Sequence, residues 1–297
     1  MQIGIIINER KSRAAASVER LLAEIDLRGD VPLVMEAKDP SDADNIPVER
    51  VRPEILRERS DVVVALGGDG TMLAAGRLLA GSGTPMIGVN LGRLGFLAEF
   101  DVEEIARTLD EVAANRTRIV ERRLLDATIE GSSDTIVALN DIVVDKRDTS
   151  MLVSLEVAVN GDYLGTYTAD GLVVATPTGS TGYALSAGGP VVAPNAGVLV
   201  IAPIAPHMLT ARPVVIADDA VISIRAKVGE YEPESAHIIA DGQIDAQLVA
   251  GRSLTIRRHP HVVHLVKSES RTYFDVLRAK LLWGGRPTQE DPERPIS

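Results

Sequence analysis

Apolar and polar positions follow two different rhythms along the chain, and the change falls near residue 120. Before that point, continuous apolar runs such as IGIIIN, DVVVALGG and TPMIGVN alternate with segments of helical spacing. One helical face is formed by residues at three- and four-residue steps: Val18, Leu21, Leu22 and Ile25. Buried strands that alternate with amphipathic helices predict an α/β domain with a parallel sheet covered on both faces.

A further helix is predicted by the segment DVEEIARTLDEV, which begins at residue 101. Asp101 is the expected N-cap, and Glu104 stands three residues later, where it completes a capping box. Apolar residues on one side of this helix, among them Ile105 and Leu109, would face the core.

Beyond residue 120 the helical period nearly disappears, and short β-rich runs follow one another up to residue 267. The segment VNGDY places Asn160 and Gly161 between two such runs, and an Asn-Gly pair is a strong signal for a two-residue hairpin. This part of the chain is therefore predicted to be a largely antiparallel all-β domain.

The last amphipathic stretch, RTYFDVLRAKLLW, predicts a C-terminal helix over 268–284 that packs back on the first domain. Phe274, Leu277 and Leu281 form its expected apolar stripe. The tail at 285–297 is rich in proline and charge, which predicts disorder. The predicted organisation is thus an α/β domain at 1–120, a β-rich domain at 121–267, a helix at 268–284 and a disordered tail.

Composition narrows the function classes. The 297-residue chain has a formal net charge of -11, which argues against a nucleic-acid surface. It contains no cysteine, which excludes disulfides, thiolate catalysis and zinc–thiolate sites. No segment approaches the roughly 20 apolar residues that span a bilayer, and the N-terminus lacks the pattern of a signal peptide. These features predict a cytoplasmic protein without a membrane partner.

The loop GGDGT follows a buried strand and leads into a predicted helix, whose first N–H groups attract anions. Gly67, Gly68, Gly70 and Thr71 are therefore candidates for binding phosphate. No Lys follows as in a Walker loop, so phosphate charge has to be met by the helix dipole and a metal. Asp69 suits a group that accepts the proton of a substrate hydroxyl in phosphoryl transfer. The alternative is that Asp69 only caps the following helix.

A second segment, TADGLVVATPTGSTGYALSAGGP, gathers small hydroxyl residues and glycines directly after a buried strand. Such loops suit sugar hydroxyls and phosphate oxygens, because each residue offers a donor without bulk.

Other polar residues are interpreted without a role in binding or catalysis. Arg122 and Arg123 are interpreted as surface charges, and the histidines of RRHPHVVH fit a solvated strand better than a metal site.

Six segments together resemble the NAD kinase family: GGDGTML, GVNLGRLGFLAEF, LNDIVV, DGLVVATPTGSTGYALSAGGP, PHMLTARPVV and IADGQ. GGDG alone is shared with lipid kinases and phosphofructokinases, whereas the TPTGST segment is characteristic. The resemblance implies transfer of the ATP γ-phosphoryl group to the 2′-hydroxyl of the adenosine ribose of NAD. It also implies a divalent cation, Mg²⁺ or Mn²⁺, and a homodimer or homotetramer.

The resemblance assigns Asp69 as general base and Gly70 as a backbone contact. Asn140 and Asp141 match the family's Asn-Glu pair, which binds the adenine and ribose end of NAD, although the acid here is one methylene shorter. The remaining positions that match dinucleotide contacts are Thr168, Asp170, Thr181, Gly182, Tyr183, Ala184, Leu185, Ser186 and Gln243. Thr168 stands where some relatives carry Arg. No metal ligand is assigned, since the metal would arrive with ATP.

Two alternatives to an NAD kinase stay open at this point. A lipid kinase would share GGDG, but the sequence has no amphipathic basic helix. A non-catalytic NAD-binding sensor would keep the fold, but it would have no use for the acid at Asp69 beside phosphates. The phosphoryl donor, ATP or inorganic polyphosphate, is also left open.

Overall fold

The computed structural model describes residues 1–8, 14–36, 50–92, 95–146, 151–227, 234–269 and 271–283. The chain divides into two compact units, one formed by residues 1–120 with 264–297 and the other by residues 121–263. The predicted disordered tail at 285–297 lies outside the described residues. No helix within these described ranges has the length and apolarity required to cross a membrane.

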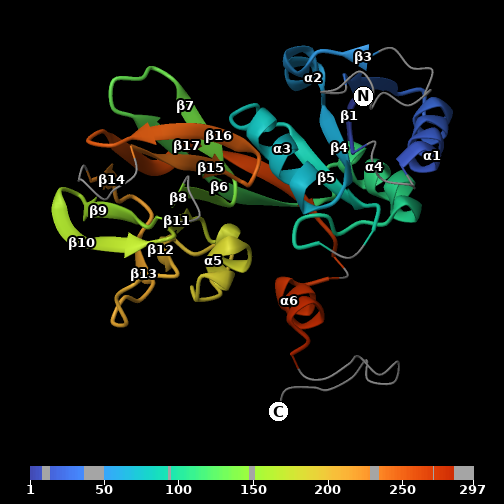
Figure 1. Cartoon of the computed structure of the whole chain (residues 1–297). Helices are drawn as coiled ribbons and strands as arrows, with labels where there is room; N and C mark the ends of the chain where they lie inside the picture. The colour runs from blue at the N-terminus through green and yellow to red at the C-terminus, as the bar shows by residue number, and fades with distance from the viewer. Residues whose placement is uncertain are drawn as a thin grey trace. The chain divides into compact units, whose positions relative to one another are not determined.

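The first unit is built on a parallel sheet with the strand order β5-β4-β1-β2-β3 (Figure 1). Its strands are β1 (Gln2–Ile7), β2 (Val31–Met35), β3 (Arg50–Val51), β4 (Val62–Gly67) and β5 (Pro85–Asn90). The end of β17 (Ser253–Lys267) pairs in parallel with β5. Every residue of β4 is buried, as a strand covered on both faces requires.

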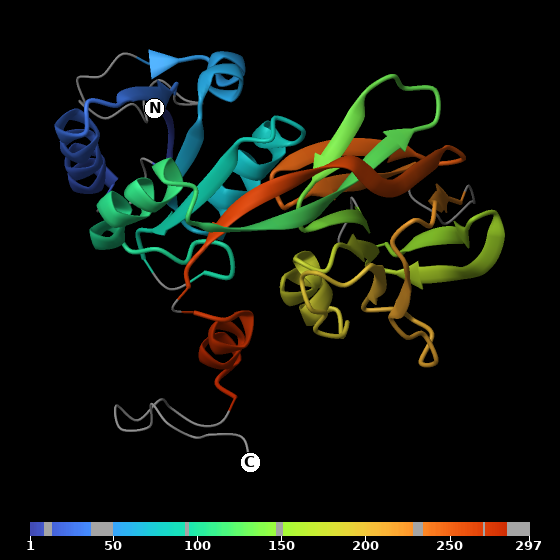
Figure 2. The ribbon, with the colours of Figure 1, turned by 180° about the vertical axis from the view of Figure 1, so that it is seen from behind.

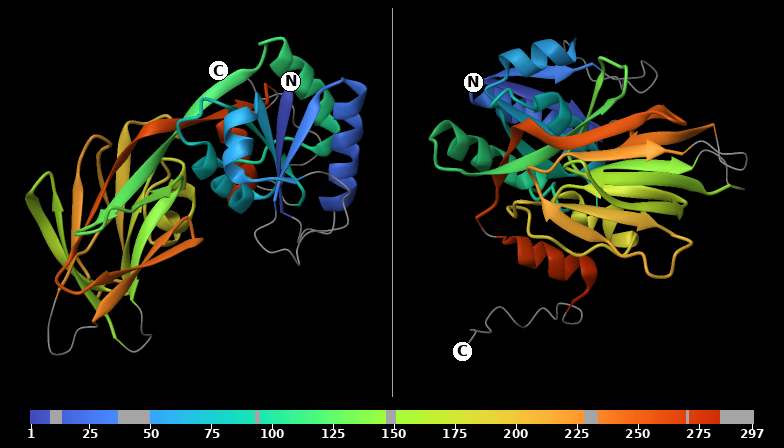
Figure 3. Two further views of the ribbon diagram at one scale, coloured as in Figure 1. Left: turned by 90° about the horizontal axis from the view of Figure 1, so that it is seen from above. Right: turned by 90° about the vertical axis from the view of Figure 1, so that its left-hand side faces the viewer.

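Helices lie on both faces of this sheet, with α1 and α4 on one side and α2 and α3 on the other (Figure 3). Their bounds are α1 (Ala14–Leu27), α2 (Pro53–Arg59), α3 (Asp69–Leu79) and α4 (Ile105–Ala113), with the short 3₁₀ turn η2 (Val102–Glu104) before α4. Val18, Leu21 and Ile25 are buried along α1, as predicted. The capping box of Asp101 and Glu104 is also present. The predicted α/β architecture is therefore confirmed.

The C-terminal helix α6 (Tyr273–Leu281) belongs to the first unit. Thr272 caps it and exchanges hydrogen bonds with Asp275. Its buried residues are Val276 and Leu277, whereas Phe274 is 59% exposed. The predicted stripe was therefore wrong at Phe274, whose ring instead packs edge-on against that of Tyr273.

The second unit contains two antiparallel layers of strands (Figure 2). One layer has the order β10-β9-β14-β17, with β6 pairing both β17 and β7; the other has the order β13-β12-β11-β8-β15-β16. The bounds in the first layer are β6 (Arg118–Ile129), β7 (Thr135–Ala138), β9 (Val153–Val159), β10 (Asp162–Ala169) and β14 (Ile222–Ala226). Those in the second are β8 (Asp141–Lys146), β11 (Gly171–Ala175), β12 (Val198–Ile204), β13 (Val214–Ala217), β15 (Ser235–Ala240) and β16 (Ile244–Val249).

The main core of this unit lies between the two layers, where alternate side chains such as Leu155, Ile224, Val144 and Ile238 meet. Asn160 and Gly161 both have positive φ, 53° and 88°, and form the predicted hairpin between β9 and β10. The antiparallel β domain is thus confirmed.

The interpretation of Arg122 as a surface charge was wrong. Its side chain lies in the buried part of β6, with the residue only 7% exposed, and its guanidinium donates to the carbonyl of Glu121. Arg123 is more accessible and forms an ion pair of 2.7 Å with Asp218. Neither arginine is a freely solvated charge.

Candidate active site

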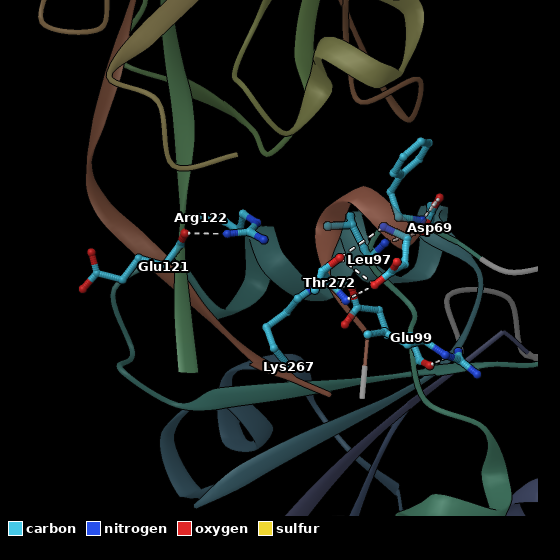
Figure 4. A network of polar contacts seen from close by, with 10 residues as sticks. Asp69, Leu97, Glu99, Glu121, Arg122, Lys267 and Thr272 are labelled. Atoms are coloured by element: carbon cyan, nitrogen blue, oxygen red, sulfur yellow. Dashed lines mark hydrogen bonds and ion pairs between the residues drawn. The ribbon is translucent and has the colours of Figure 1, made fainter. Parts of the chain in front are cut away.

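Asp69 is the first residue of α3 and follows directly on Gly68, which occupies the N-cap position. Its two carboxylate oxygens accept hydrogen bonds from the backbone N–H groups of Phe96 at 3.1 Å and Leu97 at 3.0 Å (Figure 4). The alternative that Asp69 merely caps its own helix is therefore wrong. Its carboxylate is oriented by a loop 27 residues further along the chain.

This arrangement leaves Asp69 chemically available. Each oxygen uses one acceptor direction on a backbone amide, and a carboxylate offers about four such directions in all. The residue is half-buried, so its carboxylate is held in one orientation but is still reachable. A fixed, ionisable acceptor at the N-terminal end of a helix can take a proton from a hydroxyl group placed there.

Two glycines permit this geometry. A methyl group on Gly67 would lie 2.1 Å from the Thr71 hydroxyl oxygen, and one on Gly95 would lie 2.2 Å from an Asp69 carboxylate oxygen. A methyl group on Gly68 or Gly92, in contrast, meets nothing within 4 Å. The close approach of the chain to Asp69 therefore depends on Gly95.

Gly95→Ala is expected to lower kcat by about 10–100-fold, because the added methyl group displaces the Asp69 carboxylate by roughly 1 Å. Gly92→Ala is the matched control, since it adds the same group three residues away in open space. Steady-state kinetics at saturating substrates would compare the two variants. Equal activities would show that the position of the carboxylate is not critical.

In the second unit, Asn140 and Asp141 stand at the start of β8, on a segment held by several backbone contacts. The Thr176 N–H donates to the carbonyl of Asn140 at 2.8 Å, and the Thr176 hydroxyl donates to that of Leu139 at 2.7 Å. A methyl group on Gly179 would lie 2.1 Å from the Asn140 carbonyl oxygen. The TPTGST segment thus lies directly against the Asn-Asp pair.

The side chains of this pair are arranged for polar recognition. The Asn140 side-chain oxygen is buried without a hydrogen-bond partner, which is costly unless a ligand supplies a donor. Asp141 is only 6% exposed and accepts from the backbone N–H of Tyr183. Burial, followed by the charge of Asp241, raises the pKa of Asp141 to about 7.

Asp241 is a residue that sequence reasoning missed, although it belongs to the IADGQ segment. Its carboxylate accepts from the N–H groups of Leu139, Asn140 and Asp141, at 3.0, 2.7 and 3.3 Å. In the sequence, Asp241 and Gly242 form an ordinary turn signal between strands. Only the fold reveals a contact that joins residues about 100 positions apart.

Several of the other predicted dinucleotide contacts lie in the segment that packs against Asp141. Gly182 and Tyr183 lie beside Asp141, since a methyl group on Gly182 would be 3.6 Å from its carboxylate. Gly182 joins the turn η3 (Gly179–Thr181) to the short helix α5 (Tyr183–Ser186), which Tyr183 begins. Thr181 and Leu185 are half-buried, and Tyr183 and Ser186 are exposed. Ala184 is completely buried against Val143 and Val173, so its side chain serves packing and does not reach a ligand.

Asp170, Thr168 and Gln243 belong to three other segments. Asp170 precedes β11 and forms an ion pair of 2.5 Å with Lys146. Thr168 is exposed at the end of β10, with its hydroxyl 3.1 Å from that of Ser154. Gln243 is exposed in the turn before β16. Among the residues that the structure describes, no group of three His, Asp or Glu side chains is placed to hold a metal ion.

The oriented carboxylate after a glycine-rich loop in the first unit is suited to phosphoryl transfer. The buried amide–carboxyl pair in the second unit is suited to recognition of a nucleotide. Each feature is therefore typical of the class of nucleotide-binding phosphotransferases. Two family models match the chain: the ATP-NAD kinase N-terminal domain over residues 3–119 and the ATP-NAD kinase C-terminal domain over residues 139–268. The chain therefore belongs to the NAD kinase family. The alternative of a lipid kinase is set aside by these matches.

Relatives support the same family over nearly the whole chain. An NAD kinase of Geobacter metallireducens is 40% identical over 288 residues, covering 96% of this chain and 99% of the relative. An NAD kinase of Chlorobium limicola is 36% identical over 297 residues, covering 99% and 100%.

Two solved structures share the fold. The yeast NADH kinase complexed with NADH has a TM-score of 0.85 at 25% identity, covering 100% of this chain and 89% of that one. An NAD kinase from Archaeoglobus fulgidus in complex with ATP has a TM-score of 0.72 at 26% identity, covering 93% and 99%.

Proposed function

We propose that Asp69 is the general base of the ATP-dependent phosphorylation of NAD that membership of this family gives the chain. The observation that supports this role is the orientation of its carboxylate by the amides of Phe96 and Leu97. Asp69 accepts the proton of the ribose 2′-hydroxyl while that oxygen bonds to the γ-phosphorus of ATP. The bond from that phosphorus to the bridging oxygen breaks, ADP leaves, NADP is formed, and Asp69 returns the proton to water.

The phosphates of ATP are proposed to lie at the backbone of Gly67, Gly68, Gly70 and Thr71. These residues surround the start of α3, where the helix dipole and the first N–H groups favour negative charge. Gly68 has open space where a side chain would stand, which leaves room for a phosphate to approach the backbone.

The adenosine end of NAD is proposed to contact Asn140 and Asp141. The unpartnered oxygen of Asn140 suits the exocyclic amino group of adenine, and the Asp141 carboxylate suits ribose hydroxyls. The other proposed dinucleotide contacts are Gly70, Thr168, Asp170, Thr181, Gly182, Tyr183, Leu185, Ser186 and Gln243, with Ala184 limited to its backbone.

Asn140→Ala is expected to weaken NAD binding by roughly 1–3 kcal/mol, the cost of leaving a polar group of the ligand unsatisfied. The melting temperature of the free protein should not fall, because the substitution removes a buried oxygen that has no partner. Calorimetry with NAD and, as an internal control, with ATP would test this. Equal losses for both nucleotides would mean that Asn140 has a structural role instead.

Three further properties are part of this proposal. Mg²⁺ or Mn²⁺ would reach the site with the phosphates of ATP, since hard cations favour phosphate oxygen and the GGDGT loop contains no Lys or Arg. The resemblance to NAD kinases supports a homodimer or homotetramer, which light scattering of the purified protein would test. The absence of cysteine is consistent with a cytoplasmic location, and the net charge argues against nucleic-acid partners.

Incubation of the purified chain with ATP and NAD is the direct test of function. An NADP-specific dehydrogenase coupled to the reaction would report the product. Formation of NADP that depends on ATP supports a kinase, whereas tight NAD binding without NADP would identify a non-catalytic sensor. Replacing ATP by inorganic polyphosphate would settle the range of phosphoryl donors.

A further inference from the structure

Asp241 occupies an unusual place in the second unit. It begins the turn between β15 and β16, where Asp241 and Gly242 both have positive φ, 52° and 65°. It is only 8% exposed, and its carboxylate lies across three successive backbone N–H groups, those of Leu139, Asn140 and Asp141. Its own N–H donates to the Asp141 carbonyl at 3.0 Å. One residue thus satisfies four backbone groups of a single short segment.

This segment lies where the sheet pairing stops. The ladder between β8 and β15 ends at the pair Ile142 and Ala240, so Asp141 and the two residues before β8 need other partners for their amides. The Asp241 carboxylate takes that place on one side. On the other side, Thr176 holds the carbonyls of Leu139 and Asn140. The backbone that carries the Asn-Asp pair is therefore fixed from two directions.

Three backbone donors explain why a carboxylate stands at position 241, but they do not explain why a second carboxyl group is buried beside it. Two carboxyl groups, those of Asp141 and Asp241, are both buried and repel each other when both are charged. This repulsion destabilises the free protein relative to a pair in which one of the two residues is neutral. Conflicts of this kind are tolerated mainly at functional sites.

We propose that Asp241 is a positioning residue for NAD, which holds Asn140 and Asp141 in the conformation that receives the dinucleotide. The proposal rests on the role suggested above for Asn140 and Asp141. Asp241 acts through the backbone and through its charge, and it is not assigned a contact with the substrate. Loss of Asp241 should therefore raise the KM for NAD more than it changes kcat or the KM for ATP.

The charge of Asp241 adds a second, independent consequence. Burial is the larger cause of the raised pKa of Asp141, and the charge of Asp241 adds to it, so that this pKa lies near 7. Other charged and titratable groups nearby belong to β8, to the residue before β11, to β15 and to α5: Asp145, Lys146, Asp170, His237 and Tyr183. If ribose hydroxyls donate to the ionised Asp141 carboxylate, protonation of Asp141 competes with NAD. The KM for NAD should then rise about tenfold between pH 8 and pH 6.

The test compares Asp241→Asn and Asp241→Glu with the wild-type protein. At pH 8, Asp241→Asn is expected to raise the KM for NAD at least about tenfold and to leave kcat and the KM for ATP within about threefold. Its KM for NAD should rise less between pH 8 and pH 6 than that of the wild-type protein, because loss of the neighbouring charge lowers the pKa of Asp141 while burial still raises it. Asp241→Glu, which keeps the charge, should retain the pH dependence despite a raised KM.

Asp61→Asn is the matched control, because Asp61 also accepts a backbone N–H, that of Gln2 at 2.7 Å, but lies at an exposed position in the first unit. Its kinetics and pH profile should equal those of the wild-type protein. A folded Asp241→Asn protein with wild-type KM and pH profile would overturn the proposal, as would equal losses for NAD and ATP. Failure of both Asp241 variants to fold would assign the residue to stability alone and reject positioning. If Asn140→Ala leaves NAD binding intact, the proposed NAD site itself fails, which is a separate outcome.

Discussion

Asp69→Asn is expected to lower kcat at saturating NAD and ATP by about 10²–10⁴-fold, the usual cost of losing a general base. Asn matches Asp in size but cannot accept the proton of the ribose hydroxyl. The substitution should therefore slow the chemical step even when both substrates are bound. Steady-state kinetics with both nucleotides well above their KM would measure this loss.

The structure adds a second effect of the same substitution. An asparagine oxygen can accept from only one of the two amides, Phe96 or Leu97, and its amino group would face the other N–H. We expect a loss of stability of about 1 kcal/mol, or about 2–4 °C in melting temperature for a protein of this size. A loosened loop at Phe96 and Leu97 would affect KM and the melting temperature together, whereas loss of the base affects kcat. Measuring kcat, KM and the melting temperature therefore separates the two effects.

Asp61→Asn is again a useful control, because it also removes a carboxylate that accepts a backbone N–H, in an exposed part of the same unit. It should leave kcat unchanged. A folded Asp69→Asn protein that retains kcat within about threefold of the wild type would end the assignment, since threefold is under 1 kcal/mol of barrier. Asp69 would then be a residue that only anchors the loop.

The architecture was predictable because hydrophobic period is a local property of the sequence. Runs such as DVVVALGG leave no polar face, which demands cover on both sides, and the structure places helices there. The Asn160-Gly161 turn was equally local, because its positive φ angles are a property of those two residues. The apolar spacing was a poorer guide to burial in the C-terminal helix, where it did not distinguish exposed Phe274 from buried Val276.

The candidate site was predictable only in part. Asp69, Asn140 and Asp141 could be found because they stand in recognisable segments. The contacts of these residues could not be predicted. The partners of Asp69 are the backbone N–H groups of Phe96 and Leu97, and every residue type except proline has such a group. Asp241 was missed for the same reason, because its three donors are all backbone N–H groups.

The burial of Arg122 was not predicted, because charge predicts exposure only on average and a long side chain can lie along a strand.

Removal of divalent metal is expected to bring NADP formation down to background. The transferring phosphoryl group carries charge on three oxygens, and the GGDGT loop has no Lys or Arg to balance it. Asp69 adds a further negative charge at the start of α3, where the helix dipole supplies only about half a positive charge. A metal ion contributes several kcal/mol of charge stabilisation in such a step, which corresponds to on the order of 10³-fold or more in rate.

The measurement is the rate of NADP formation after treatment with excess EDTA and removal of the chelated metal, followed by addition of Mg²⁺ or Mn²⁺. The melting temperature should stay unchanged throughout, because the described residues hold no group of three His, Asp or Glu side chains that could bind a structural metal. Activity should return on adding either ion, since the ligands would come largely from ATP itself. Full turnover in excess EDTA would show that the chain neutralises the phosphates with its own cations, and the role given to the GGDGT loop would have to be abandoned.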